Sequence, residues 1–164
     1  MSSSKEDGAA ERSSVSDTFA DKEDFVTFII ANQLFGIPVL RVQDVLSSHN
    51  ITRIPLAPPE IAGSLNLRGR VVTAMDVRLR LGLPPRESKV TMSIVVENEG
   101  ELYSLMVDSV GEVLALKSSA WERNPPTLDS KFRDYSLGIY HLDGKLLVVL
   151  DVKRLLDYDR DQAA

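Results

Sequence analysis

An internal repeat limits the folds open to this 164-residue chain more than any other feature of its sequence. Residues 34–46 set over residues 102–114 give five identities in thirteen positions without a gap, at an offset of 68. Residues 63–77 set over residues 138–152 give five identities in fifteen positions, at an offset of 75. Two matches in the same order and at nearly the same offset indicate a tandem duplication of a unit of about 65 to 70 residues.

Each unit is predicted to be rich in strands. Short apolar runs such as residues 25–30 and 92–96 are separated by glycine, asparagine and proline, which is typical of strands joined by tight turns. Closure removes unpaired sheet edges, so we expect a mainly β fold of two closed or nearly closed small barrels, with short helices. Units this small bury a modest fraction of their surface. They should therefore share apolar surface as one folding domain, with a binding groove between them.

The two ends of the chain differ from its middle. Residues 1–24 hold seven acidic and three basic side chains, and so contribute −4 of the net charge of −5. We expect residues 1–22 to be a disordered tail, because they contain too little apolar surface to offset the entropy of ordering. Residues 23–158 are predicted to be the folded domain, with the exchange between the two units near residues 80–90, and residues 159–164 a C-terminal tail.

Composition excludes several classes of function. The chain has no cysteine, which rules out disulfides and thiolate chemistry. It has no apolar run of the roughly 18 residues that a membrane span needs, and its N-terminus is polar. We therefore expect a cytoplasmic protein without direct membrane insertion.

Four arginines gather in residues 66–80, where Asp76 is the only acid, so that this stretch carries a local charge of +3. Such a cluster could meet phosphate or carboxylate groups, although solvated strand and helix faces are the favoured explanation. The cluster consists of Arg68, Arg70, Arg78 and Arg80.

Arg68 is the arginine that the repeat sets apart. It is matched by Asp143 in the second unit, so the shared architecture does not require its guanidinium group. Arg68-Gly69-Arg70 is predicted to be the tight turn of a hairpin, from which an arginine can make a forked contact with a partner's carboxylate or backbone carbonyls. Alternatively, Arg68 pairs with an acid inside the protein and fixes the loop.

The valines at positions 39, 42 and 45 are a second ambiguous feature. Together with Leu46 they fall at spacings of three and four, which favours a short helix or a strand followed by a turn of helix. An equivalent stripe recurs at Val110 and Val113 in the second unit. These valines are either core residues or the lining of the groove between the units.

No motif of an enzyme is present. Asp76 and Asp151 occur at matched positions and are expected to cap the short helices that follow them, and a paired-carboxylate active site has no other support. The two histidines, His49 and His141, lie outside any cluster of ligands or of a catalytic triad. We therefore expect no catalysis, no metal and no cofactor.

Four segments resemble the successive signature segments of the CheW family of chemotaxis coupling proteins. They are FVTFIIANQLFGIPVLRVQDVL, TRIPLAPPEIAGSLNLRGRVVTAMDVRLRLGL, VDSVGEVL and LDGKLLVVLDVKRLL. The resemblance runs from Glu23 to Asp157, and NLRG with its flanks is its most specific part. It implies two intertwined five-stranded barrels and an adaptor without catalysis. Because no receiver or kinase segment is attached, a stand-alone family member is expected.

The resemblance also implies partners. Family members link the cytoplasmic tip of methyl-accepting chemoreceptors to the regulatory domain of the histidine kinase CheA, within receptor arrays at the membrane. By resemblance, the free protein is a monomer that binds no nucleic acid. The positions expected to face the receptor are Asn66, Arg68, Val110 and Val113, and those expected to contact the kinase or the receptor are Val42, Asp44, Val45 and Gly63.

Two other functions remain open from the sequence. The four arginines could belong to an OB-like double barrel that binds single-stranded nucleic acid, but aromatic residues make up 6% of the chain and few lie beside the arginines. A hydrolase that depends on Asp76 is the third possibility.

Overall fold

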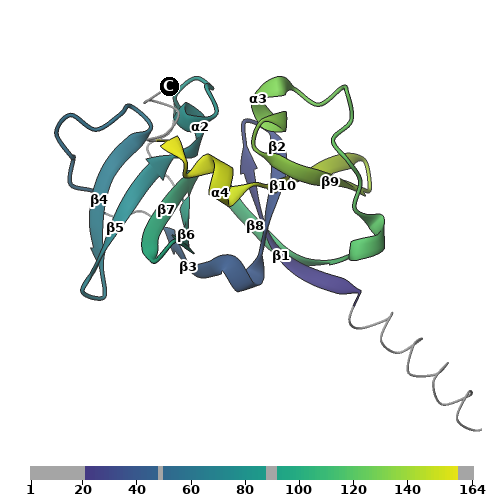
Figure 1. The fold of residues 1–164 in the computed structure, drawn as a ribbon, viewed down its shortest axis with the longest axis horizontal. Coiled ribbons are helices and arrows are strands. Elements are labelled where there is room, and N and C mark those ends of the chain that lie inside the picture. Colours follow the sequence, from purple (N-terminus) through teal and green to yellow (C-terminus); the bar gives the residue numbers. More distant parts are fainter. Residues whose placement is uncertain (1–20, 48–49, 88–91, 159–164) are drawn as a thin grey trace, which may run out of the picture.

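The protein forms two lobes, each built on a five-stranded sheet (Figure 1). The computed structural model describes residues 21–47, 50–87 and 92–158. Lobe 1 has the strand order β8-β1-β2-β10-β9. Its strands are β1 (Lys22–Ile30), β2 (Gln33–Pro38), β8 (Ser109–Lys117), β9 (Ser136–Leu142) and β10 (Lys145–Leu150). β1 thus begins at Lys22, the last residue of the predicted N-terminal tail, and residues 1–20 lie outside the described part.

Lobe 2 has the strand order β3-β6-β7-β5-β4. Its strands are β3 (Val42–Ser47), β4 (Ile61–Leu67), β5 (Arg70–Asp76), β6 (Met92–Asn98) and β7 (Glu101–Val107). The described part of the chain also contains five short helical segments: η1 (Val39–Arg41), α2 (Val77–Arg80), η2 (Ser118–Ala120), α3 (Ser130–Arg133) and, after the last strand, α4 (Val152–Leu155). The predicted mainly β fold with short helices is confirmed.

The duplication is visible in the strand register. Leu147 of β10 lies opposite Leu34 of β2 in lobe 1, and Val72 of β5 lies opposite Leu102 of β7 in lobe 2. The repeat matches position 34 with position 102, at an offset of 68, and position 72 with position 147, at an offset of 75. The two pairs therefore occupy equivalent places in the two units. The lobes are also intertwined, because β3 follows β2 in the chain but pairs in lobe 2, whereas β8 follows β7 but pairs in lobe 1.

The sheets are open rather than hydrogen-bonded all the way round. In the described residues no ladder joins β3 to β4, or β8 to β9. Single bridges, Thr52 to Ser64 and Glu122 to Ile139, instead lie along β4 and β9. A connecting segment thus shields each of these edges, as barrel closure would.

One apolar core spans both lobes. It contains Phe28 and Phe35 of lobe 1, whose rings stack with centroids 5.5 Å apart, together with Met75 and Leu105 of lobe 2. Two smaller clusters fill the individual lobes, around Val72 in lobe 2 and Leu147 in lobe 1. The prediction that the units share apolar surface is therefore confirmed.

A charged clasp joins the lobes beside this core. Asp108, between β7 and β8, accepts hydrogen bonds at 2.8 Å from Arg78 Nε on α2 and from the Ala31 amide in the β1–β2 turn. Arg86 Nε adds a longer contact of 3.4 Å. Partial burial acts to raise the pKa of Asp108, but the bonds from Arg78 and Ala31 outweigh it, so that the pKa lies below its ordinary value.

We expect Asp108→Asn to lower the free energy of unfolding by about 1–3 kcal/mol at pH 7, because charge-assisted bonds are lost at a half-buried site. Since the pKa is lowered on folding, this stabilisation is present above the unfolded-state pKa of about 4 and disappears as the pH falls through the folded value. Urea unfolding at pH 7 and near pH 3 measures the difference, with the exposed Asp143→Asn as the matched control. An equal effect of Asp108→Asn at both pH values would contradict the prediction.

Candidate interaction site

The β4–β5 turn presents Arg68 at the end of lobe 2. Arg68 and Gly69 have φ angles of 52° and 83°, the left-handed pair of a tight two-residue hairpin. The Gly69 amide donates a 2.9 Å hydrogen bond to Asn66 Oδ1. Asn66 therefore holds the shape of the turn through its side-chain oxygen, and Arg68 is the side chain that projects from it.

An ion pair connects this turn to the opposite edge of the same sheet. Arg68 Nη2 lies 3.1 Å from Asp44 Oδ2 on β3, and the two side chains are 79% and 26% exposed. Asp44 Oδ1 accepts a 2.8 Å bond from the Val45 amide, which orients the carboxylate. A pair this exposed contributes about 0–1 kcal/mol, so it positions the guanidinium more than it stabilises the fold.

Lobe 1 has no equivalent pair. The repeat places Asp143 at the position of Arg68 and Glu112 at the position of Asp44, so both counterparts are acidic. The scaffold is thus shared by the lobes, whereas a basic tip held by a carboxylate belongs to lobe 2.

The valines at spacings of three, Val42 and Val45 in one lobe's sheet and Val110 and Val113 in the other's, lie on strands that contain bulges. The predicted helix is confirmed only for the single turn of η1 at residues 39–41. In β3 the register shifts between Val42 and Asp44, so that Val42 lies opposite Val96 and Val45 opposite Ile94. The extra residue of a bulge puts positions three apart on one face.

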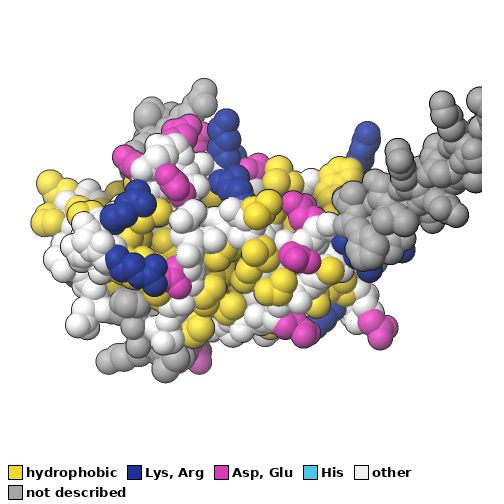
Figure 2. Space-filling view, turned by 90° about the horizontal axis from the view of Figure 1, so that it is seen from below, with side chains coloured by type: hydrophobic (Ala, Val, Ile, Leu, Met, Phe, Trp, Pro, Cys, Tyr) yellow, Lys and Arg dark blue, Asp and Glu magenta, His cyan; other side chains and the backbone are white. Residues whose placement is uncertain are grey.

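The same bulge occurs in β8, where Val110 lies opposite Phe28 and Val113 opposite Val26. All four partner residues of the two stripes belong to the shared core, so both stripes border the region between the lobes. Val42 and Val110 pack against that core, while Val45 and Val113 are 40% and 56% exposed. Figure 2 shows apolar side chains across the middle of the underside, with basic side chains toward lobe 2.

Gly63 serves the architecture. It is buried in β4 with a φ of 150°, and an added Cβ would overlap the carbonyl oxygen of Thr52. Gly138, its counterpart in the repeat, has a φ of 146° and lies under the Trp121 ring. Any effect of Gly63 on a partner therefore acts through the packing of the segment around Thr52.

The arginine cluster of the sequence is dispersed in the fold. Arg78 is bound to Asp108, and Arg80 Nε donates a 2.7 Å bond to the Leu155 carbonyl while its guanidinium lies 5.1 Å from the Tyr135 ring centre. Arg68 pairs with Asp44, which leaves Arg70 as the remaining exposed member. The basic groove that a single-strand binder needs is therefore not assembled from these residues.

The two matched aspartates are helix caps, as predicted. Asp76 Oδ1 accepts from the Leu79 amide at 3.5 Å, and Asp151 Oδ1 accepts from the Arg154 amide at 3.0 Å. His141 lies at the surface of β9, with Nε2 3.0 Å from Glu122 Oε2, and His49 falls outside the described residues. Within the described ranges, no three or more acidic or histidine side chains gather as metal ligands.

Two residues that the sequence reasoning did not single out have prominent positions. Asp108 is the centre of the clasp between the lobes, and Leu40 on η1 is 92% exposed. The repeat alignment places these two residues opposite each other. At this matched position one unit has an apolar residue and the other a charged one. That difference is the sequence signal that could have identified both residues.

The fold defines a two-lobed β protein with one five-stranded sheet in each lobe. No helix in the described part of the chain is long and apolar enough to cross a membrane. The CheW-like domain family matches residues 24–160, and the chain belongs to this family.

Individual relatives agree with this assignment. The chemotaxis protein CheW of Helicobacter pylori is 28% identical over 136 residues, which are 82% of each chain. That of Bacillus subtilis is 29% identical over 144 residues, covering 87% of this chain and 92% of the relative. The crystal structure of the scaffolding protein TtCheW from Thermoanaerobacter tengcongensis superposes with a TM-score of 0.74 and 32% identity, covering 82% of this chain and 92% of that one. The chain thus belongs to the family that the resemblance predicted.

Proposed function

We propose that this protein is a non-catalytic adaptor that couples the cytoplasmic tip of methyl-accepting chemoreceptors to the regulatory domain of CheA. The observation that carries the proposal is Arg68. It projects from a tight turn, is 79% exposed, and is matched by an acid in the other lobe. Family membership supports the choice of these partners, and the exposed tip suits a charged contact with one of them.

The chemistry proposed for the receptor contact follows from the exposure of Arg68 and from its ion pair with Asp44. The ion pair with Asp44 uses Nη2 of the guanidinium, so the other N–H groups of this exposed side chain can donate to a carboxylate or carbonyl of the partner. The exposed Val113 and the half-buried Val110 supply apolar area, and Asn66 keeps the turn in shape. Arg68, Asn66, Val110 and Val113 make up the proposed receptor surface.

A second set of residues is proposed to contact the kinase or the receptor. Val42, Asp44 and Val45 lie along the edge strand β3, where a homologous β domain can pack barrel to barrel, and Gly63 shapes β4 at the opposite edge of the sheet. We assign these four residues to the kinase or to the receptor.

Modest individual contacts suit a component of an array. Free in the cytoplasm, the protein is a monomer, and receptor arrays recruit it to the membrane surface without insertion. Simultaneous contacts in the array then supply avidity that neither contact has alone. No nucleic acid, metal or cofactor takes part in this role.

Co-sedimentation of the purified protein with receptor-bearing membranes, with and without CheA, tests the proposal. We expect the protein to sediment with receptors alone, and to retain more CheA in the pellet when all three components are present. Failure to bring CheA down under conditions in which the receptor and kinase are both active would refute the adaptor role.

A further inference from the structure

A second candidate surface surrounds Leu40, at the junction of β2 and β3. Leu40 lies on the short helix η1 and is 92% exposed, so its side chain contributes almost nothing to the core. The repeat matches it with Asp108, which is polar and fully engaged in the clasp between the lobes. The common architecture therefore does not require an apolar side chain here.

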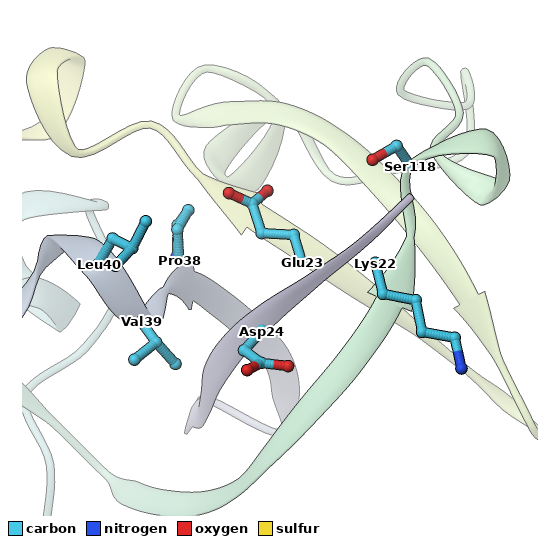
Figure 3. Close-up of a pocket in the computed structure, with 7 residues that line it drawn as sticks. All are labelled: Lys22, Glu23, Asp24, Pro38, Val39, Leu40 and Ser118. Carbon is cyan, nitrogen blue, oxygen red and sulfur yellow. The ribbon is translucent and has the colours of Figure 1, made fainter. Parts of the chain in front are cut away.

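Two hollows flank Leu40, and it forms part of the wall of both. The first has a volume of about 480 Å³ and lies between β1 and η1 (Figure 3). It is lined by Lys22, Glu23, Asp24, Val39, Leu40 and Ser118, with Pro38 at the start of η1. The second has a volume of about 390 Å³ and is lined by Leu40, Arg41, Gln43, Glu97, Glu99 and Gly100. Leu40 is thus a single apolar knob with a depression on each side.

The charge around the knob is negative. Glu23 and Asp24 border the first hollow and Glu97 and Glu99 the second, against one cation in each, Lys22 and Arg41. The preceding residues 1–20 hold four acidic and two basic side chains, so charge repulsion disfavours this segment as the occupant. The same negative field disfavours nucleic acid and anionic lipid surfaces.

From this geometry we infer that the Leu40 knob and its two acidic hollows form a docking surface for a basic amphipathic helix of a partner protein. A helix face offers holes bounded by four side chains, into which one projecting leucine fits. The walls of the flanking hollows are largely charged or polar, so they suit basic side chains next to that hole. Lysine or arginine there meets the four carboxylates. This surface is separate from Arg68 and does not depend on the proposed receptor contact.

Binding of a synthetic helix built from leucine and lysine tests the inference, with a peptide carrying glutamate in place of every lysine as the control ligand. Fluorescence anisotropy gives the affinity for the full-length protein. Leu40→Ala should weaken binding of the leucine–lysine peptide about tenfold, because the buried knob is lost. The double variant Glu97→Gln with Glu99→Gln should weaken binding several-fold and flatten its dependence on salt.

Matched controls separate this surface from general attraction to an acidic protein. Leu56→Ala removes another fully exposed leucine, and Asp143→Asn removes an exposed carboxylate of lobe 1. Both should change the affinity by less than about twofold. The melting temperature of Leu40→Ala should equal that of the wild type, which shows that the variant is folded.

Three results would overturn the inference: no measurable binding of the leucine–lysine peptide, equal losses in Leu40→Ala and Leu56→Ala, or equal binding of the glutamate peptide. Arg68→Glu tests independence from the adaptor role. It should bind the peptide normally even where it fails in receptor coupling, so the two hypotheses can fail separately.

Discussion

Arg68→Glu is expected to abolish receptor-dependent control of CheA while the protein remains folded. The side chain is 79% exposed and its internal ion pair contributes at most about 1 kcal/mol, so the melting temperature should change little. An arginine that anchors an interface typically contributes about 2 kcal/mol or more, which corresponds to a loss of affinity of roughly 30-fold. Kinase activity in the presence of receptor-bearing membranes, together with co-sedimentation, measures the effect.

Two further variants distinguish a partner contact from an internal role of Arg68. Arg70→Glu changes the charge of the same hairpin by the same amount at an exposed neighbouring position, and it should preserve most of the coupling. The double variant Asp44→Arg with Arg68→Asp restores an internal ion pair but presents the opposite charge to the partner, so we expect no rescue. Full recovery of coupling in the double variant would show that Arg68 acts inside the protein.

Gly63→Ala is expected to have the largest effect on stability. Its φ of 150° is a conformation that L-residues rarely adopt, and the new methyl group would overlap the carbonyl of Thr52, which is held by two backbone hydrogen bonds of 2.7 and 2.8 Å between Thr52 and Ser64. Strain and overpacking together should cost about 3–5 kcal/mol. The melting temperature should fall by roughly 10 °C or more.

Substitution of two other glycines separates the effects of backbone strain and of steric overlap on this loss of stability. Gly144 also has a positive φ, of 77°, but an added Cβ would meet open space, so Gly144→Ala should cost about 1 kcal/mol. Gly138 has a φ of 146° and faces the partly exposed Trp121 ring, which can move more easily than a backbone carbonyl. In thermal unfolding, the fall in melting temperature should therefore be largest for Gly63→Ala, smaller for Gly138→Ala and smallest for Gly144→Ala. A smaller loss at Gly63 than at Gly144 would contradict the role given to the Thr52 segment.

Residues that recur in both units were the ones whose structure the sequence predicted best. Asp76 and Asp151 cap their helices, and Gly69 and Gly144 lie in turns with positive φ, because capping and tight turns depend on residues only a few positions apart. The bulges of β3 and β8 escaped prediction. A spacing of three between Val42 and Val45 is typical of a helix, and only pairing with β6 shows that an extra residue in a strand produces it.

The sequence by itself determined that the protein is a duplicated, mainly β chain with two lobes, because periodicity, turn residues and repeat offsets are local properties. It also set Arg68 apart from the scaffold. Only the tertiary structure decided what each arginine does: Arg78 meets Asp108, 30 positions away, Arg80 meets Leu155, 75 positions away, and Arg68 meets Asp44, 24 positions away. The physical reason is that the curl of a sheet and the docking of two lobes bring distant edges together, and no local pattern encodes which acid an arginine will reach.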